Sequence, residues 1–359
     1  MRAELLEPTS QRWTDLLSGM RHDFYHLPSY LQFATRHQEE GQPLAFAAEE
    51  GGDRFLAPLI VRPIPADVVG DRRPLFDASC SRGYPGPLVA LAPGRDPGDF
   101  VDRAVDAFVE TLRQRRIVAA FVRLHPLLMP PMSSLMRAGR VVEHGQSSSI
   151  DLSLSREALW RQTNHGHRSG INKSIRLGYV ARIDEHWDGF DAFVGLYQQS
   201  MKRVEANPFW WLSHEYFRDL RDSIGDHLHL AVVEIEGDVA AAALLTETDG
   251  IVEFHLSGTA DAYVRASPSK LLISFAASWA KARGNRTLHL TGSISPGDPL
   301  SQFKMGFSPL RHPACTWRLV ADPIAYGELV ERWEARAEAT ADPLEGWFPA
   351  FRKPLTDHG

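Results

Sequence analysis

The sequence predicts an α/β (α+β) protein of two domains, each with a mixed, mainly antiparallel sheet. Three observations support this prediction. The chain has 359 residues, which is more than twice the length of an average domain of roughly 150 residues. Amphipathic helical patterns alternate with short apolar strands in both halves of the chain. Tight-turn sequences join several of these strands, as in antiparallel hairpins.

Elements of the first half follow one another in a regular order. A hairpin is expected around the turn Glu50-Gly51-Gly52-Asp53, because apolar runs flank it on both sides. A helix follows, since apolar residues recur at intervals of three and four. The expected strands cover residues 44–48, 55–62, 117–124 and 141–152, and the helix covers 100–115. The first domain is therefore expected to span residues 1–150.

The second half contains more helices and a three-stranded meander. Its hairpin turns are Glu236-Gly237-Asp238 and Thr248-Asp249-Gly250, which favour tight antiparallel connections. One expected helix begins at Ser155, and four more cover 167–177, 190–204, 213–223 and 267–282. The expected strands cover 227–235, 239–246, 251–257, 287–290 and 316–320. We expect a second domain over 151–321, and a helical tail within 322–359 that completes the first domain.

Composition excludes several classes of protein. Hydrophobic residues make up 43% and charged residues 23% of the chain, which is typical of a globular protein. No apolar run approaches the ~18 residues of a membrane span. The first residues include Glu4 and Glu7 and lack the apolar stretch of a secretion signal. Cys80 and Cys315 are too few for a disulfide framework. We expect a soluble cytoplasmic protein with no bound metal and no membrane span.

Charge is distributed unevenly along the chain, although the net charge is only −6. Residues 156–182 hold six bases and one acid, and residues 281–318 hold the same numbers. Residues 184–261 hold sixteen acids and four bases. Basic regions on an acidic protein suit a phosphate-bearing ligand better than indiscriminate binding of nucleic acid. Solvated basic helix faces explain the same pattern without a ligand.

Common catalytic motifs are absent. The sequence has no G-x-G-x-x-G, no P-loop and no G-x-S-x-G. His214-Glu215 begins like a zinc protease helix, but Arg218 stands where the second histidine is needed. Dinucleotide, P-loop nucleotide and serine hydrolase chemistry therefore have no support.

A series of short motifs in the second half resembles a known family. It comprises Phe254-His255-Leu256-Ser257-Gly258-Thr259, Pro268-Ser269-Lys270-Leu271-Leu272, Leu288-His289-Leu290 and Gln302-Phe303-Lys304-Met305-Gly306-Phe307, preceded by Arg168-Ser169-Gly170-Ile171-Asn172-Lys173-Ser174. In the first half, Asp23-Phe24-Tyr25 and Gly83-Tyr84-Pro85-Gly86-Pro87-Leu88 belong to the same pattern. In this order the motifs resemble the FemAB-like aminoacyltransferases of the acetyltransferase (GNAT) superfamily.

The resemblance implies two tandem GNAT-like N-acyltransferase domains, here without the coiled-coil insertion of some members. It implies transfer of an aminoacyl group from aminoacyl-tRNA to an amine, with no resident cofactor and no DNA partner. The acceptor would be a peptidoglycan precursor or another amine-bearing small molecule. The chain departs from the family pattern at Ser269, where asparagine is usual, at Asn172, where arginine is common, and at Thr291-Gly292-Ser293, which replaces a glycine pair. These departures suit a compact, divergent group whose acceptor is a small metabolite.

Lys304 is the main catalytic candidate. Attack of an amine on an ester needs a positive charge near the developing oxyanion, together with a held geometry. Lys304 follows Phe303, which is expected to fix it, and precedes Gly306, which allows close approach. A lysine on the surface of a short helix is the simpler alternative.

Further candidates come from the motifs around it. His255 shares a predicted strand face with Glu253 and is a candidate proton relay, with a hydrogen-bonded core histidine as the alternative. Arg168 and Lys173 are candidate phosphate ligands, although a five-residue spacing turns them about 140° apart on a helix. Tyr84 is expected to line the acceptor site or to pack within its loop, and Asp298 to orient an amine or cap a helix. The resemblance adds Tyr197, Arg203 and Phe303 as substrate-binding residues.

Two other functions fit the sequence. An acyl-CoA-dependent N-acyltransferase uses the same fold, but the nearest match to a coenzyme A pyrophosphate loop, Arg95-Asp96-Pro97-Gly98-Asp99, is poor. A non-catalytic binding module would be expected to lose the Phe303-Lys304 pair, which is present here. The sequence specifies neither the acceptor, nor the transferred group, nor the oligomeric state.

Overall fold

The computed structural model describes residues 1–37, 40–70, 73–94, 97–293, 299–342, 344 and 346–355. The chain divides into two compact units. Unit 1 comprises Met1–His144 and Ala314–Gly359, and unit 2 comprises Gly145–Pro313. Among the described residues, no helix combines the length and the apolar composition that crossing a membrane requires.

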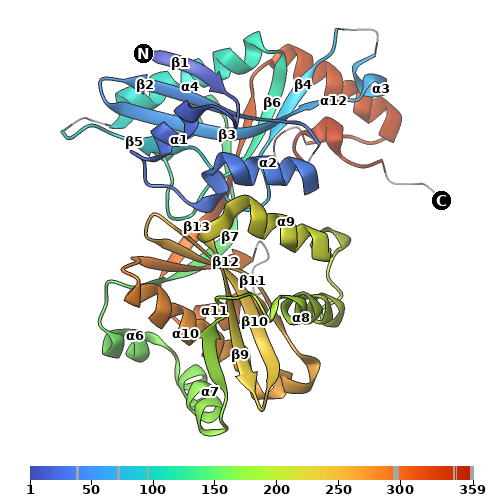
Figure 1. Ribbon diagram of the computed structural model, residues 1–359. Helices are drawn as coiled ribbons and strands as arrows, with labels where there is room; N and C mark the ends of the chain where they lie inside the picture. The colour runs from blue at the N-terminus through green and yellow to red at the C-terminus, as the bar shows by residue number, and fades with distance from the viewer. Residues whose placement is uncertain are drawn as a thin grey trace. The chain divides into compact units, whose positions relative to one another are not determined.

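Unit 1 is built on a mixed sheet (Figure 1). Its strands are β1 (Arg2–Leu6), β2 (Gln42–Glu50), β3 (Asp53–Pro63), β4 (Phe76–Ser79), β5 (Leu88–Ala90), β6 (Ile117–Arg123) and the greater part of β13 (Arg311–Val320). They pair in the order β1–β2–β3–β4–β6–β13, with β5 on β3. Every pair is antiparallel except β4 with β6.

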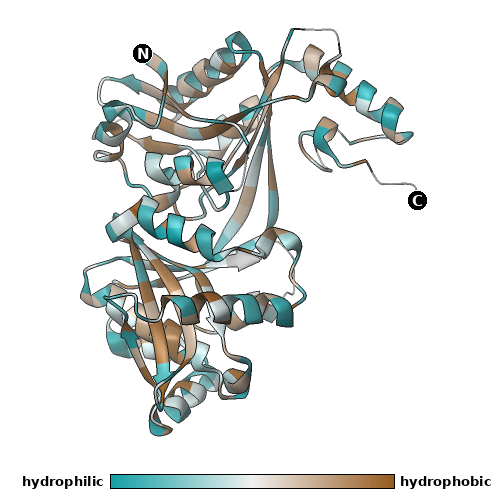
Figure 2. Ribbon diagram, turned by 45° about the vertical axis from the view of Figure 1, so that its right-hand side comes forward, coloured by the Kyte–Doolittle hydropathy of each residue, from teal (hydrophilic) through white to brown (hydrophobic). Residues whose placement is uncertain are grey.

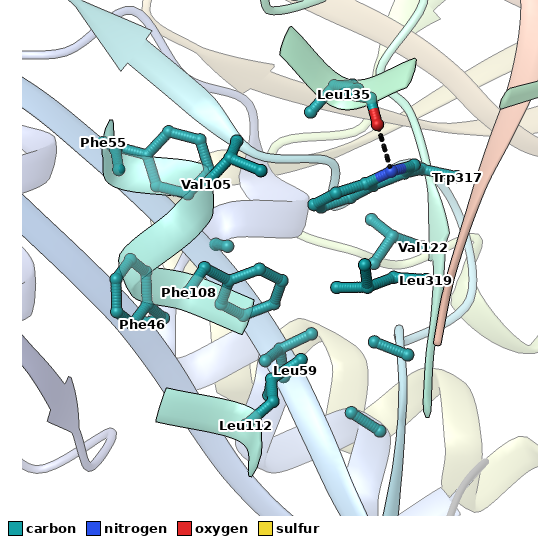
Figure 3. Close-up of a cluster of buried hydrophobic side chains, with 14 of the residues drawn as sticks. Phe46, Phe55, Leu59, Val105, Phe108, Leu112, Val122, Leu135, Trp317 and Leu319 are labelled. Carbon is teal, nitrogen blue, oxygen red and sulfur yellow. Dashed lines mark hydrogen bonds between the residues drawn. The ribbon is translucent and has the colours of Figure 1, made fainter. Parts of the chain in front are cut away.

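A buried apolar cluster joins this sheet to its helices. The helices are α1 (Gln11–Leu17), α2 (Pro28–His37), α3 (Ala66–Val69), α4 (Pro97–Gln114), α5 (Met132–Ala138) and α12 (Pro323–Ala337), with one-turn helices η1 (Phe24–His26) and η5 (Ala350–Arg352). Phe108 of α4 packs between Phe46 of β2 and Trp317 of β13 (Figure 3). The Trp317 indole donates to the Leu135 carbonyl at 3.0 Å, so the largest ring of the cluster has its polar atom satisfied.

Unit 2 repeats the same strand arrangement. Its strands are β8 (Val180–Ile183), β9 (Leu228–Ile235), β10 (Asp238–Thr248), β11 (Ile251–Thr259), β12 (Thr287–Ser293) and the C-terminal part of β7 (Arg140–Asp151). They pair in the order β8–β9–β10–β11–β12–β7. The one parallel pair in this series is β11 with β12, and α10 connects the two strands.

Helices cover both faces of this sheet. They are α6 (Arg156–Gln162), α7 (His165–Arg176), α8 (Phe190–Arg203), α9 (His214–Ile224), α10 (Pro268–Ala282) and α11 (Pro299–Met305), with short 3-10 helices η2 (Pro208–Trp210), η3 (Gly225–His227) and η4 (Asp261–Ala266). Leu272 of α10 and Ile171 of α7 share a buried cluster with Leu288 of β12. On the other face, the backbone of α8 lies against Gly258 of β11. The brown colouring in Figure 2 is concentrated in the strands, which lie between these helices.

In each unit, the strand that ends the pairing order is not the strand that follows next along the chain. In unit 1, β6 leads through α5 to β7, but the strand that pairs with β6 is β13. In unit 2, β12 leads through α11 to β13, but the strand that pairs with β12 is β7. The expected boundaries at 150/151 and 321/322 differ from the observed units because of this exchange. Residues 145–150 lie in unit 2, and residues 314–321 lie in unit 1.

The predicted fold class, α/β with mainly antiparallel sheets, is confirmed. The hairpin β2–β3 and the meander β9–β10–β11 form antiparallel pairs as predicted. Asp249 and Gly250 both have positive φ angles, of 44° and 79°, which the tight turn between β10 and β11 requires. Ser155 caps α6 by accepting a hydrogen bond from the Ala158 amide at 3.2 Å.

Candidate active site

The site of interest in unit 2 lies where β11 and β12 stop pairing. Their parallel register covers three pairs and ends at Glu253 with His289, although β11 continues to Thr259 and β12 to Ser293. A bulge lies at the same level of β11: Leu245 pairs with Phe254 and Leu244 pairs with Leu256, so His255 is the extra residue. A bulge bends its strand and redirects the extra side chain. We call the region beyond Glu253 and His289 the fork.

A hydrogen-bonded chain of buried side chains marks the closed end of the fork. Glu253 accepts from His289 Nδ1 at 2.7 and 2.8 Å, and His289 Nε2 lies 2.9 Å from Ser147 Oγ. All three residues are buried, and they come from β11, β12 and β7. A carboxylate accepts hydrogen bonds, so His289 Nδ1 donates to Glu253. This chain links three adjacent strands at the residues where two of them separate.

Lys304 is buried rather than on the surface of its helix. It lies on α11, is 9% exposed, and its Nζ donates to Thr291 Oγ1 at 2.7 Å. Thr291 lies on the fork side of β12 and has a positive φ of 58°. The hydrogen bond therefore holds the ammonium group of Lys304 beside the fork, and the alternative of a surface lysine is wrong.

The start of α7 is attached to the Lys304 segment. His167 Nε2 donates to the Phe303 carbonyl at 2.8 Å, and the Asn164 amide donates to the Gly306 carbonyl at 2.8 Å. The rings of Phe303 and Phe307 lie 5.0 and 4.5 Å from that of His167. Burial lowers the pKa of His167, so a neutral imidazole with its proton on Nε2 fits this contact. Gly306 leaves room for it, because a Cβ there would lie 2.4 Å from Asn164 Nδ2.

Comparison with known families agrees with this arrangement. Residues 161–305, which include the fork, α7 and Lys304, match the family model of the acetyltransferase (GNAT) domain. Unit 2 therefore contains a GNAT-type acyltransferase domain. No curated protein matches the chain in sequence.

Solved structures share the fold over nearly the whole chain. FemX is 11% identical over 91% of this chain and 99% of its own, with a TM-score of 0.69. A C-terminal domain from Agrobacterium fabrum, described as that of a lysylphosphatidylglycerol synthetase, is 16% identical over 89% and 92%, with a TM-score of 0.53. L-PGS from Bacillus licheniformis is 14% identical over 91% and 97%, with a TM-score of 0.50. At these identities the likeness establishes the fold, which is the fold that the FemAB-like resemblance implied.

Within the GNAT domain, several predicted site residues lie apart from the Lys304 segment. Tyr197 is 1% exposed and donates to the Trp210 carbonyl at 2.8 Å, between the rings of Phe193 and Phe217. It packs α8 against its neighbours, so a substrate does not reach it in this conformation. Arg203 forms an ion pair with Asp261 and donates to the Thr259 carbonyl at 3.2 Å, which ties the end of α8 to the end of β11.

The basic helix α7 carries its candidates on different faces. Arg168 lines a surface pocket beside α6, whereas Lys173 is exposed and does not line that pocket. The 140° separation expected from the spacing explains the difference. His255 is half-buried at the bulge, and the histidine bonded to Glu253 is His289. Regular alternation, from which a shared strand face of His255 and Glu253 was expected, is interrupted by the bulge at His255.

Two candidates remain. Tyr84 belongs to unit 1, where it is half-buried with its ring 5.9 Å from Tyr25 and 6.2 Å from His125. His125 forms a buried hydrogen bond of 3.0 Å with Asp23 in the same unit. Asp298, like Arg95 and Asp96, lies outside the described residues.

Proposed function

We propose that the protein transfers an aminoacyl group from aminoacyl-tRNA to an amine, as a cytoplasmic FemAB-like aminoacyltransferase. The observation that carries the proposal is the buried Lys304, whose ammonium group is held beside the fork by Thr291. A fixed positive charge in a site shielded from water stabilises a developing oxyanion far better than one in bulk solvent. The names of FemX and lysylphosphatidylglycerol synthetase are consistent with this reaction class.

The reaction needs few groups. The amine attacks the ester carbonyl, the C–N bond forms, and the charge that develops on oxygen faces Lys304 Nζ. The C–O bond to the donor then breaks and its hydroxyl leaves with a proton, while the amine loses one. His255, half-buried at the bulge beyond Glu253, is the proposed proton acceptor. Because the ester is already activated, positioning and this one cation account for the chemistry.

A second candidate is an acyl-CoA-dependent N-acyltransferase. It is favoured by the GNAT family match and by the fork, where β11 and β12 no longer pair with each other. The acceptor in either case is an amine, in a peptidoglycan precursor or a small metabolite.

Radiolabelled donors separate the two candidates. The purified protein is incubated with aminoacyl-tRNA or acetyl-CoA and a panel of amines, each with and without ribonuclease. The proposal predicts a labelled amide from aminoacyl-tRNA alone, lost when ribonuclease is added before the protein. Label transferred from acetyl-CoA and unaffected by ribonuclease would replace it with the second candidate.

A further inference from the structure

A pocket of about 630 Å³ lies on the outward face of α7, beside Trp160 of α6. These are the two green helices in the lower part of Figure 1. The pocket is lined by Trp160, His165, Arg168, Ser169, Asn172, Ile175 and Arg176. Its volume falls within the range of roughly 300–1,000 Å³ that small-molecule sites occupy. Residues 165, 168, 172 and 176 recur at helical spacing, so they form one stripe.

The two arginines of this stripe are available for a ligand. Across the part of the chain that the structure describes, neither forms an ion pair. Arg168 donates to the Trp160 carbonyl at 3.5 Å, and Arg176 to the Asn172 carbonyl at 3.4 Å, both long contacts. A planar guanidinium binds phosphate through two parallel hydrogen bonds. Two such groups two helical turns apart, in a stretch of net positive charge, suit a ligand with more than one phosphate group.

The same pocket offers flat apolar surface. Trp160 is 36% exposed and Ile175 is 55% exposed, although both are large hydrophobic residues. An exposed indole next to guanidinium groups is the combination on which nucleic acid bases stack while their phosphates are held. Asn172 and Ser169 add polar groups that can reach a base or a sugar.

We infer that this pocket binds a nucleoside phosphate, with its base on Trp160 and its phosphates on Arg168 and Arg176. The inference rests on the proposed function, because it supplies the donor site of that reaction. Both donors carry this chemistry: aminoacyl-tRNA ends in a nucleotide, and coenzyme A contains an adenosine phosphate. The opposite face of α7 carries His167, which is bonded to the carbonyl next to Lys304. One helix, about 10 Å across, therefore separates the pocket from the proposed catalytic lysine.

Binding is measured without any reaction, by fluorescence anisotropy of a labelled RNA hairpin with the single-stranded 3′ end of tRNA. Unlabelled coenzyme A serves as the competitor, and the variants of the full chain are Trp160→Ala, Trp160→Phe, Arg168→Ala and Arg176→Ala. Lys173→Ala is the matched control, because it removes one charge from the same helix outside the pocket. Thermal unfolding confirms that each variant is folded.

Trp160→Ala is expected to weaken RNA binding by roughly 5- to 150-fold, the range of one lost base stack, and Trp160→Phe to retain most of the affinity. Arg168→Ala and Arg176→Ala are each expected to reduce the slope of log affinity against log salt by about 0.7, one phosphate contact on a single strand. Lys173→Ala should leave the slope unchanged. Displacement by coenzyme A with the same variant dependence would identify coenzyme A as a source of the ligand.

Two results would overturn the inference: RNA and coenzyme A binding that does not depend on Trp160, or a loss in Lys173→Ala equal to that in Arg168→Ala. The latter would mean general electrostatic attraction. Failure of the proposed function is a separate result. A protein that binds RNA through Trp160 but transfers no aminoacyl group keeps the pocket and loses the reaction.

Discussion

At the scale of single residues, Lys304 is the strongest test of the proposed chemistry. Lys304→Met keeps most of the apolar length of the side chain and removes the charge. Turnover is expected to fall by on the order of 10²–10³, the effect of losing one oxyanion-stabilising group. Thr291 also donates to the Leu290 carbonyl at 2.7 Å, a bond that the substitution does not remove, so the loss of stability should be about 1 kcal/mol. Steady-state kinetics with the authentic donor and acceptor, and urea unfolding, measure the two effects.

Phe303→Ala is the companion variant, because Phe303 packs against His167 and Phe307. It should lose both activity and stability, whereas Lys304→Met should lose mainly activity. Full turnover by Lys304→Met would remove the lysine from the mechanism, and with it the proposed reaction at this site.

His26 links the stability of unit 1 to pH. Burial, followed by the charge of His125, lowers the pKa of His26 to about 3, whereas an unfolded histidine titrates near 6.5. Between these values the unfolded chain binds a proton that the folded chain does not, so stability falls as the pH falls below about 6.5. From about pH 7.5 to about pH 5.5 this one group should remove about 1.4 kcal/mol.

The measurement compares urea unfolding of the parent and of His26→Gln at the two pH values. The variant should lose about 1.4 kcal/mol less than the parent, since its side chain does not titrate. An equal loss in both proteins would show that His26 does not contribute to the acid sensitivity.

At the scale of elements, β11 and α8 approach each other at Gly258. A Cβ on Gly258 would lie 2.3 Å from the Leu196 carbonyl carbon and 2.4 Å from the Tyr197 amide nitrogen. Both atoms are backbone, so the helix itself would have to move. Gly258→Ala is expected to destabilise the protein by about 1–3 kcal/mol, the usual cost of overpacking. Gly195→Ala on α8 is the control, because nothing lies within 4 Å of its Cβ.

Gly195→Ala should raise stability by about 0.5–1 kcal/mol through helix propensity. Urea unfolding of both variants gives the comparison. If Gly258→Ala is as stable as Gly195→Ala, the strand and helix are not in close contact.

The hydrogen bonds among Glu253, His289 and Ser147 also act between elements, because they join three strands. His289→Ala leaves a buried carboxylate without its imidazole, and is expected to cost about 3–5 kcal/mol. Ser147→Ala removes one neutral hydroxyl, and should cost only about 1 kcal/mol. Denaturant midpoints of the two variants would be similar if the carboxylate were not ionised or not dependent on His289.

The same elements show what the sequence could predict. Hairpins such as β10–β11 were predictable, because turn residues and alternation are local signals. The pairing of Glu253 with His289 was not, since a helix separates the two strands and the parallel register depends on packing. The sequence did contain one signal for His289. It lies between Leu288 and Leu290, which both belong to the buried apolar cluster, so alternation along the strand points His289 to the opposite face. The bulge at His255 has no local signature, so the alternation from which its strand face was predicted is interrupted there.

At the scale of the whole molecule, the exchange of β7 and β13 determines which part of the chain completes each unit. Unit 2 is continuous, whereas unit 1 needs residues from both ends of the chain. Trp317 and Leu319 of β13 belong to the buried cluster of unit 1, and Leu329 and Trp333 of α12 to a second cluster of that unit. The sequence predicted that the terminal helix returns to the first half. It did not predict the exchanged strands, because the apolar pattern of a strand does not specify which neighbour it pairs with.

A chain ending at Pro313 tests this dependence. It lacks α12 and the part of β13 that pairs with β6. Unit 1 therefore loses one strand of its sheet and the residues that β13 and α12 contribute to two buried apolar clusters. Large apolar surfaces left open in this way remove more free energy than the roughly 5–15 kcal/mol by which a domain is stable. Limited proteolysis followed by mass spectrometry should then show rapid cleavage within residues 1–144 and a protected fragment near 145–313.

A chain ending at Leu355 is the control. Both of its units should be protected from cleavage, since it retains the hydrogen bond of 2.8 Å from the Trp333 indole to the Lys353 carbonyl. Equal protection of residues 1–144 in the two chains would mean that unit 1 folds without its returning segment, and the assignment of β13 and α12 to that unit would fail.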